Sequence, residues 1–280
     1  MKPVRQDVFM KEEIVRMDDV QSRFDDRGIA IDRAGVSGLR YPIVVLDQKD
    51  GRQETVAKLS MSVSLPHHFK GTHMSRFIEV LNSHRGEVTM RTLPQILHEL
   101  KERLEAETAH IDVKFPYFVE REAPVSGKKA LMDYECAFIG ESNGVKDDFI
   151  LRVRVPVTSL CPCSKEISDY GAHNQRGYIT IDVRSTRKED GKAEIIWIEE
   201  LIEVAERSSS SPVYALIKRE DERFVTMQAY DNPVFVEDMV RMVAEQLIEN
   251  TKVTWFHVHA ENDESIHNHN AFAELEWSRN

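Results

Sequence analysis

Residues 150–183 read ILRVRVPVTSLCPCSKEISDYGAHNQRGYITIDV, two apolar, β-branched runs on either side of a loop rich in reactive side chains. The runs cover 150–157 and 178–183. Short apolar runs of this kind, bounded by turn-forming residues, are typical of β-strands with at least one buried face. The stretch therefore predicts two strands joined by a loop at 158–177, and loops carried on rigid strands are where chemistry tends to lie.

The loop contains both thiol and imidazole groups. Cys161 and Cys163 form a C-P-C triplet, and His173 follows in the same loop. Thiolate and imidazole are common ligands of zinc-like ions. We therefore expect a metal site with a catalytic role, in which one thiolate binds the ion and the other lies nearby. Two buried structural cysteines and a solvated histidine are the alternative interpretation of the same residues.

Composition narrows the class of protein. The chain has 280 residues, 41% hydrophobic and 30% charged, enough for one large domain or two of ordinary size. Its 3 cysteines are an odd number and sparse, which favours a reducing, cytoplasmic environment. The formal net charge of -11 argues against a nucleic-acid partner. No apolar run approaches the ~20 residues that cross a bilayer, and we expect neither a membrane partner nor a secretory signal.

The first half of the chain shows β, then α, then β patterns. Residues 1 to about 40 are charged and weakly periodic, which predicts an N-terminal arm, partly disordered, with little core of its own. Asp50-Gly51 is a favourable hairpin dipeptide. Hydrophobic periodicity then predicts strands at 39–46 and 55–65, helices at 75–81 and 92–104, and strands at 109–122 and 130–139.

The second half repeats that order. It predicts strands at 146–158 and 177–187, helices at 198–205 and 233–249, and strands at 251–261 and 271–278. The fold class is therefore α+β, a tandem pair of ββααββ modules with antiparallel sheets and helices on one face. We place the first module at 41–143 and the second, which carries the metal loop, at 144–280. Exposed sheet edges are usually paired, so we expect closure by oligomerisation.

Two polar groups lie at predicted helix N-termini. Lys70, His73 and Arg76 precede and begin the helix at 75–81, where helix N–H groups favour an anion. A flexible basic loop is the alternative. Glu237 lies near the start of the helix at 233–249. A carboxylate there either complements the helix dipole or binds the amide-and-amine edge of a guanine-type ring.

Two polar segments offer further carboxylates and a histidine. Residues 208–222 mix small and charged side chains, which is typical of a solvated loop, but a carboxylate from them would complete an open three-ligand metal site. Residues 261–270 read as a polar hairpin loop. Their Glu264 and His267 are candidate proton carriers near neutral pH.

Four segments together resemble the type IB GTP cyclohydrolases: SLCPCSKEISDYGAHNQRG, KGTHMSRF, LIKREDERFVT and NPVFVEDMVR. The resemblance covers nearly the whole chain from about residue 40. It implies two tunnelling-fold (T-fold) modules assembled as a homotetramer. It also implies hydrolysis of GTP at purine C8 to 7,8-dihydroneopterin triphosphate and formate, the first step toward folate and related pterins. The alternatives are another pterin or purine enzyme of this fold, or a non-catalytic metal-binding module.

The resemblance also implies roles for single residues. Cys161 and His173 would bind one divalent ion per active site, zinc, manganese or iron, with Glu222, or alternatively Glu220, as the third ligand. Glu237 would anchor the guanine. The implied acid/base groups are His267, Glu264 and Cys163. On physical grounds the candidate phosphate ligands are Lys70, His73 and Arg76, which we expect to reach the site from another subunit.

Overall fold

The computed structural model describes residues 19–84, 87–144, 147–189 and 193–279. Its strands are β1 (Ile31–Asp47), β2 (Gly51–Leu65), β3 (Ala109–Glu122), β4 (Lys129–Ser142), β5 (Asp147–Leu160), β6 (Asn174–Ser185), β7 (Ser211–Pro212), β8 (Val253–Asn262) and β9 (Ala271–Ser278). Its helices are α1 (Met74–Ser83), α2 (Leu93–Leu104), α3 (Pro162–Ile167), α4 (Ile198–Arg207), α5 (Arg219–Asp231) and α6 (Val236–Glu249).

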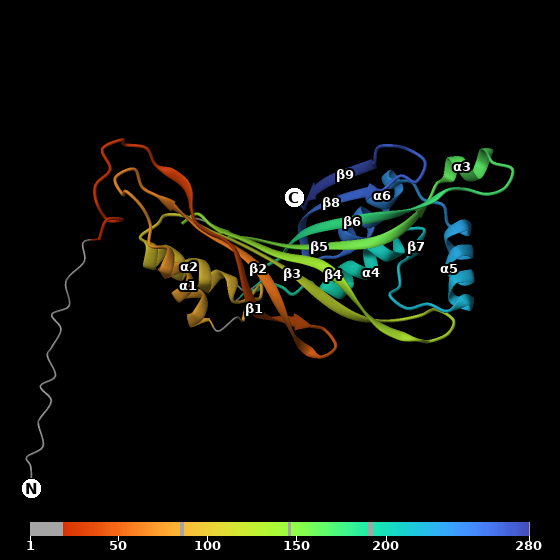
Figure 1. Cartoon of the computed structure of the whole chain (residues 1–280), viewed down its shortest axis with the longest axis horizontal. Coiled ribbons are helices and arrows are strands. Elements are labelled where there is room, and N and C mark those ends of the chain that lie inside the picture. The colour runs from red at the N-terminus through yellow and green to blue at the C-terminus, as the bar shows by residue number, and fades with distance from the viewer. Residues whose placement is uncertain (1–18, 85–86, 145–146, 190–192, 280) are drawn as a thin grey trace, which may run out of the picture.

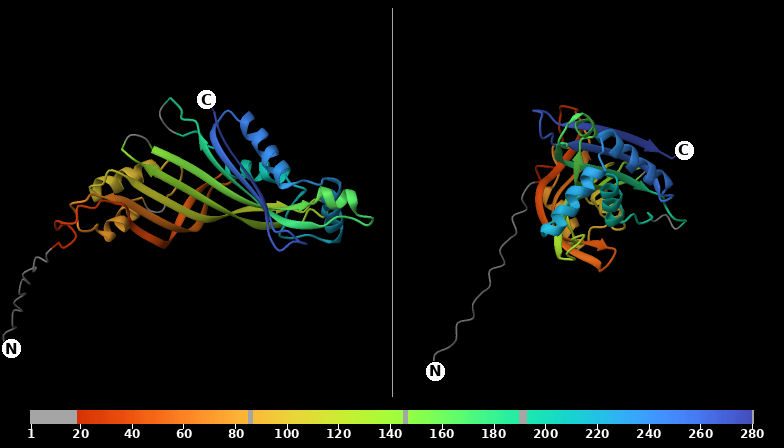
Figure 2. Two further views of the ribbon diagram at one scale, coloured as in Figure 1. Left: turned by 90° about the horizontal axis from the view of Figure 1, so that it is seen from above. Right: turned by 90° about the vertical axis from the view of Figure 1, so that its right-hand side faces the viewer.

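One nine-stranded antiparallel sheet runs along the length of the molecule (Figure 1). Its strand order is β1-β2-β3-β4-β5-β6-β8-β9, with β7 paired to β5. Figures 1 and 2 show α1 and α2 toward one end of the sheet, and α4 and α6 toward the other end. The predicted large antiparallel sheet with helices on one side is confirmed. Among the described residues, no helix has the length and apolarity needed to cross a membrane.

The sheet forms where the sequence alternates. In β2, Ala57, Leu59, Met61 and Val63 are buried, while the residues between them are exposed or half-buried. The buried side chains face the helices, which contribute their own apolar stripes to the same core. The hairpin predicted at Asp50-Gly51 is confirmed, because Gly51 adopts a φ of 80° at the start of β2.

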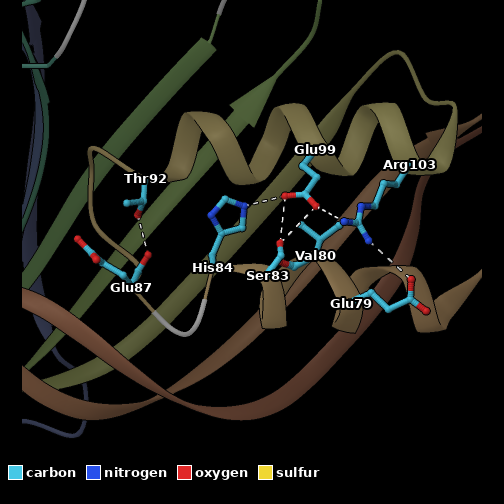
Figure 3. A network of polar contacts seen from close by, with 8 residues as sticks. All are labelled: Glu79, Val80, Ser83, His84, Glu87, Thr92, Glu99 and Arg103. Carbon is cyan, nitrogen blue, oxygen red and sulfur yellow. Dashed lines mark hydrogen bonds and ion pairs between the residues drawn. The ribbon is translucent and has the colours of Figure 1, made fainter.

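The α1–α2 pair is joined by a polar network (Figure 3). The carboxylate of Glu99 on α2 meets Nε2 of His84 at 2.9 Å and the guanidinium of Arg103 at 2.6 Å. Thr92 is the N-cap residue of α2, but its hydroxyl donates to the Glu87 carbonyl at 2.8 Å and does not cap the helix. The predicted start of the helix near residue 92 is thus confirmed, and the Thr92 hydroxyl closes the turn before the helix.

The first strand begins earlier than the sequence indicated. β1 starts at Ile31, not near Leu39, and pairs with β2 through two irregularities, the first between Ile31 and Ala34. The side chains of residues 31–38 are exposed or half-buried, so the sequence shows no apolar alternation there. Backbone pairing with β2 holds this part of the strand in the sheet. Residues 1–18 of the predicted arm lie outside the described residues, as does the predicted strand start at 146.

The prediction of a solvated loop through 222 was wrong, because residues 219–231 form α5. This helix buries only Asp221 and Ala229, so it turns no apolar stripe into the core of its own chain. Its start is fixed by the fully buried Asp221 carboxylate. That carboxylate accepts from the N–H of Lys218 at 2.7 Å and from the N–H of Val125 at 2.8 Å.

Candidate active site

Cys161 and His173 lie at the two ends of the loop that joins β5 to β6. The N–H of Cys161 donates to the carbonyl of His173 at 3.1 Å, which brings the two residues together. Cys161 is also the N-cap of α3, and its Sγ accepts from the N–H of Ser164 at 3.4 Å. Pro162 occupies the first turn of this short helix, which the sequence did not predict. Cys161 is half-buried and Cys163 is exposed.

The third cysteine differs in its surroundings. Cys136, on β4, is 3% exposed, and burial raises the pKa of its thiol. A thiol that stays protonated is a poor nucleophile and a poor metal ligand. All three cysteines are free.

Hydrogen bonds orient the His173 ring. Its Nδ1 lies 2.7 Å from Oε1 of Gln175, and since an amide oxygen only accepts, Nδ1 carries the proton. The other end of the Gln175 amide donates to Glu264 at 3.3 Å, which fixes the amide in that orientation. With the proton on Nδ1, Nε2 is the ring nitrogen whose lone pair can bind a metal ion. Sequence reasoning missed Gln175, although its place two residues after His173 on a strand puts it on the same face.

A cavity of about 420 Å³ opens beside Cys161. Glu237, Glu264 and Gln175 line it together with the apolar side chains of Phe235 and Phe272. The segment before α6 is held at this place because the N–H of Val234 donates to the Leu160 carbonyl at 3.1 Å. A cavity with apolar walls and a few polar groups is typical of a site for a small planar molecule.

Asn262 adds a buried amide to the cavity wall. It is 2% exposed, and its Nδ2 donates to the Ser159 hydroxyl at 2.9 Å. Its Oδ1 is buried and has no hydrogen-bond partner among the described residues. A Cβ atom at Gly177 would lie 2.4 Å from that oxygen, so the asparagine fits only because residue 177 is glycine. Neither residue was singled out from the sequence.

The carboxylates proposed as the third metal ligand lie elsewhere in the chain. Glu220 and Glu222 are exposed in the first turn of α5. The far end of α5 contacts α3, where Lys165 Nζ donates to the Tyr230 carbonyl. A helix rise of ~1.5 Å per residue puts Glu222 about 12 Å from Tyr230 along α5. In the part of the chain that the structure describes, no three His, Cys, Asp or Glu side chains are grouped to hold an ion.

The two histidines of the 261–270 loop stack on each other. The ring centroids of His267 and His269 are 5.1 Å apart. His269 lines the cavity. His267, the predicted proton carrier, is exposed and stacks against His269. Glu264, the other predicted carrier, does line the cavity.

The KGTHMSRF segment lies at the opposite end of the sheet from Cys161, as the positions of α1 and α3 show (Figure 1). Within one chain, its three candidate phosphate ligands therefore do not reach the metal loop. Nε2 of His73 pairs with Asp19 at 3.0 Å. Arg76 donates to the Arg103 carbonyl at 2.7 Å, at the end of α2.

Comparison with known proteins identifies the family. Residues 17–273 match the family described as "Type I GTP cyclohydrolase folE2". The chain belongs to the FolE2 family. Its relative named GTP cyclohydrolase FolE2 from Syntrophus aciditrophicus is 55% identical over 260 residues, which cover 93% of this chain and 99% of that protein. The FolE2 protein of Nitrosococcus oceani is 52% identical over 260 residues, covering 93% of this chain and 95% of that protein.

Solved structures share the fold of this FolE2 chain at low identity. Urate oxidase from Bacillus subtilis aligns with a TM-score of 0.52 and 10% identity, covering 88% of this chain and 98% of that one. Uricase from Arthrobacter globiformis gives a TM-score of 0.51 and 9% identity, covering 89% and 93%. This likeness confirms the architecture of a long antiparallel sheet with helices on one side.

Proposed function

We propose that this protein is a metal-dependent type IB GTP cyclohydrolase that hydrolyses GTP at purine C8 to 7,8-dihydroneopterin triphosphate and formate. Membership of the FolE2 family supports the activity. One observation supports its location: the hydrogen bond of His173 Nδ1 to Gln175 leaves Nε2 for a metal ion, and Cys161, which is bonded to the His173 backbone, lines a cavity with Phe235 and Phe272 in its wall. The reaction would be the first step of pterin and folate synthesis.

The donor set fits one divalent ion per site. Cys161 Sγ and His173 Nε2 would hold it, and these ligands suit zinc, while an added carboxylate also suits manganese or iron. Glu222, with Glu220 as the alternative, would supply the carboxylate. Since α5 begins far from the loop within one chain, we assign that carboxylate to a neighbouring copy.

Exposed apolar side chains support assembly into a homotetramer with active sites between subunits. Phe224, Met227 and Tyr230 recur on one side of α5 and are 45%, 47% and 42% exposed. Ile167 and Tyr170, near the metal loop, are 83% and 101% exposed. Large apolar side chains gathered in this way mark interaction surfaces. Two ββααββ modules, divided near residue 143, would leave β1 and β9 as edges for pairing, and assembly would bring KGTHMSRF of one copy to the Cys161 loop of another.

The residues around the cavity provide binding and proton transfer. When bound, the ion supplies Lewis acidity toward the water that adds to C8. The Glu237 carboxylate accepts the N1–H and 2-amino hydrogens of guanine and orients C8 toward Cys161. Asn262 lines the same cavity, and its Oδ1 has no hydrogen-bond partner among the described residues. Glu264 and His267 would carry the protons that the ring nitrogens take up as the imidazole ring opens.

The decisive experiment is Cys161→Ala, assayed for fluorescent pterin after oxidation of the product. We expect turnover to fall by at least about 100-fold, more than for loss of an outer group around a metal. We also expect metal content to fall and the far-UV circular dichroism spectrum to stay unchanged. Near-normal turnover would contradict the site assignment. Retained metal in a wild-type protein that forms no pterin would favour the non-catalytic metal module.

A further inference from the structure

A row of positive charges crosses the face of the sheet that lies away from the helices. Arg40 on β1 is the direct cross-strand partner of Lys58 on β2, and Lys58 is the direct partner of Lys114 on β3. The same row continues through Ala137 on β4 to Arg152 on β5. Directly paired residues project to the same face of a sheet, so these side chains lie side by side. We call Arg40, Lys58, Lys114 and Arg152 the basic row.

The basic row should lower the stability of the sheet in the isolated chain. Like charges placed directly opposite on neighbouring strands destabilise a sheet. The chain has 48 acidic residues, yet no carboxylate among the described residues lies within ion-pair distance of Arg40 or Lys58. Lys114 reaches Asp112 only at 3.6 Å, with its side chain 63% exposed. Arg152 alone is well paired, to the buried Asp182 at 2.6 Å.

The row surrounds a hollow of about 710 Å³. The small, buried Ala137 lies between Lys114 and Arg152 and leaves room between their longer side chains. Arg154 also lines the hollow, with its guanidinium 3.6 Å from the centre of the Tyr178 ring. Its partner Glu135 is 74% exposed, at 3.2 Å. The volume is in the range of sites for small phosphorylated molecules.

The hollow is separate from the candidate active site. A strand rise of ~3.3 Å per residue puts Arg154 roughly 23 Å from Cys161 along β5. The two cavities have no lining residue in common. The basic row therefore cannot contribute to the Cys161 cavity of the same chain.

We propose that this hollow binds a polyphosphate anion. Arg40, Lys58 and Lys114 provide the charge that the fold leaves uncompensated, and charge-assisted hydrogen bonds to phosphate oxygens would relieve their mutual repulsion. The bound group is either inorganic polyphosphate or the triphosphate end of a nucleotide. Binding would stabilise the folded chain by mass action.

The test is calorimetric titration of the metal-free full-length protein with inorganic tripolyphosphate, and separately with ATP. We expect Lys58→Gln/Lys114→Gln to weaken tripolyphosphate binding by about tenfold or more, since each charged hydrogen bond is worth roughly a factor of ten. Lys128→Gln, an exposed lysine in the β3–β4 turn, is the matched control and should bind as wild type does. Equal affinity for both probes would indicate a phosphate-only site, and tighter binding of ATP would indicate a nucleotide site.

A second variant separates this hollow from the proposed substrate site. Lys70 is a candidate ligand of the substrate phosphates, so Lys70→Gln should weaken only a binding event at that site and keep the separate event that Lys58→Gln/Lys114→Gln loses. If only Lys70→Gln lost binding, or if none of the variants did, the proposal would be overturned. Binding of a single-stranded oligonucleotide without tripolyphosphate binding, or a change of oligomeric state in the double variant, would also overturn it in favour of a nucleic-acid or a protein interface.

Stability supplies an independent readout. Removing like charges should raise the Tm of the anion-free double variant by about 1–3 °C, while tripolyphosphate should raise the Tm of wild type but not of the variant. If the two lysines only stabilised the fold, the double variant would instead have a lower Tm than wild type in the absence of the anion. If the double variant does not fold, Arg40→Gln tests the same two expectations: a higher Tm without the anion, and a smaller rise in Tm when tripolyphosphate is added.

Discussion

Two polar regions at the same end of the molecule are built in opposite ways. The first, which we call the hairpin clamp, consists of Glu206 and Asp221 with the β3–β4 hairpin groups that they bind. Glu206 is 6% exposed and accepts from the Tyr134 hydroxyl at 3.1 Å and from Arg121. The second is the metal loop, 161–173, where Cys163 is exposed and Cys161 is half-buried.

The difference teaches which polar groups hold the fold and which remain available for chemistry. Burial raises the pKa of Glu206, and Arg121 opposes that rise, so the clamp keeps an ionisable group buried by pairing it. In the loop, Cys161 Sγ accepts one long bond and His173 Nε2 is left free by the bond at Nδ1. A satisfied network gives stability, whereas available donor atoms beside a cavity give reactivity.

The largest expected effect is on the clamp. Glu206→Ala leaves Arg121 and Tyr134 without their buried partner, which should cost about 3–5 kcal/mol of the free energy of unfolding and lower the Tm by roughly 10 °C. Thermal and urea unfolding measure this. Glu203→Ala, an exposed glutamate on the same helix, is the control and should change little. A Glu206→Ala protein as stable as wild type would mean that the clamp does not hold the hairpin.

The next effect is on the loop and leaves stability nearly unchanged. Gln175→Ala should weaken metal affinity and turnover by about 10–100-fold, because the His173 ring loses the acceptor that orients it. Gln175→Glu keeps an acceptor and should recover part of the metal affinity. Gln246→Ala removes a comparable half-buried amide on α6 and should leave metal affinity unchanged. Equal metal affinity in Gln175→Ala and wild type would exclude this positioning role.

The hairpin clamp should also contribute less to the free energy of unfolding in acid. Burial alone would raise the pKa of Asp221, but hydrogen bonds from Ser126, Lys218 and Val125 outweigh burial and hold the pKa well below its ordinary value of 3.8. A lowered carboxyl pKa gives stability that is present above pH 3.8 and is lost as the pH falls below it. Urea unfolding between pH 6 and pH 3 should therefore show a smaller pH-dependent loss for Asp221→Asn than for wild type. Parallel curves would contradict this.

The smallest effect is expected at the exposed thiol. Cys163→Ser should change the free energy of unfolding by less than about 0.5 kcal/mol, because the side chain is exposed. Its metal content should equal that of wild type if Cys161 is the thiolate ligand. Elemental analysis of the purified protein measures this, and loss of metal in Cys163→Ser would make the second thiol a ligand.

Sequence patterns predicted the position of a strand best where inward-facing and outward-facing side chains alternate regularly. The predicted strands 109–122 and 271–278 coincide with β3 and β9, since their side chains alternate between the core and the outer face. The pattern failed at α5, which turns no apolar stripe into the core and whose start is fixed by the polar contacts of Asp221. It also failed at α3, which is one short turn begun by Pro162 and capped by a thiol.

By itself, the sequence determined most of the longer strands, the helices with an apolar stripe and the loop that brings Cys161 and His173 together, because periodicity and short-range spacing are local properties. Only the tertiary structure decided that Gln175 orients His173, that Gly177 makes room for Asn262, and that Glu222 lies away from the loop of its own chain. It alone aligned Arg40, Lys58 and Lys114. The pairing of strands depends on register, which is set by the turns together with the face that each strand buries in the assembled sheet.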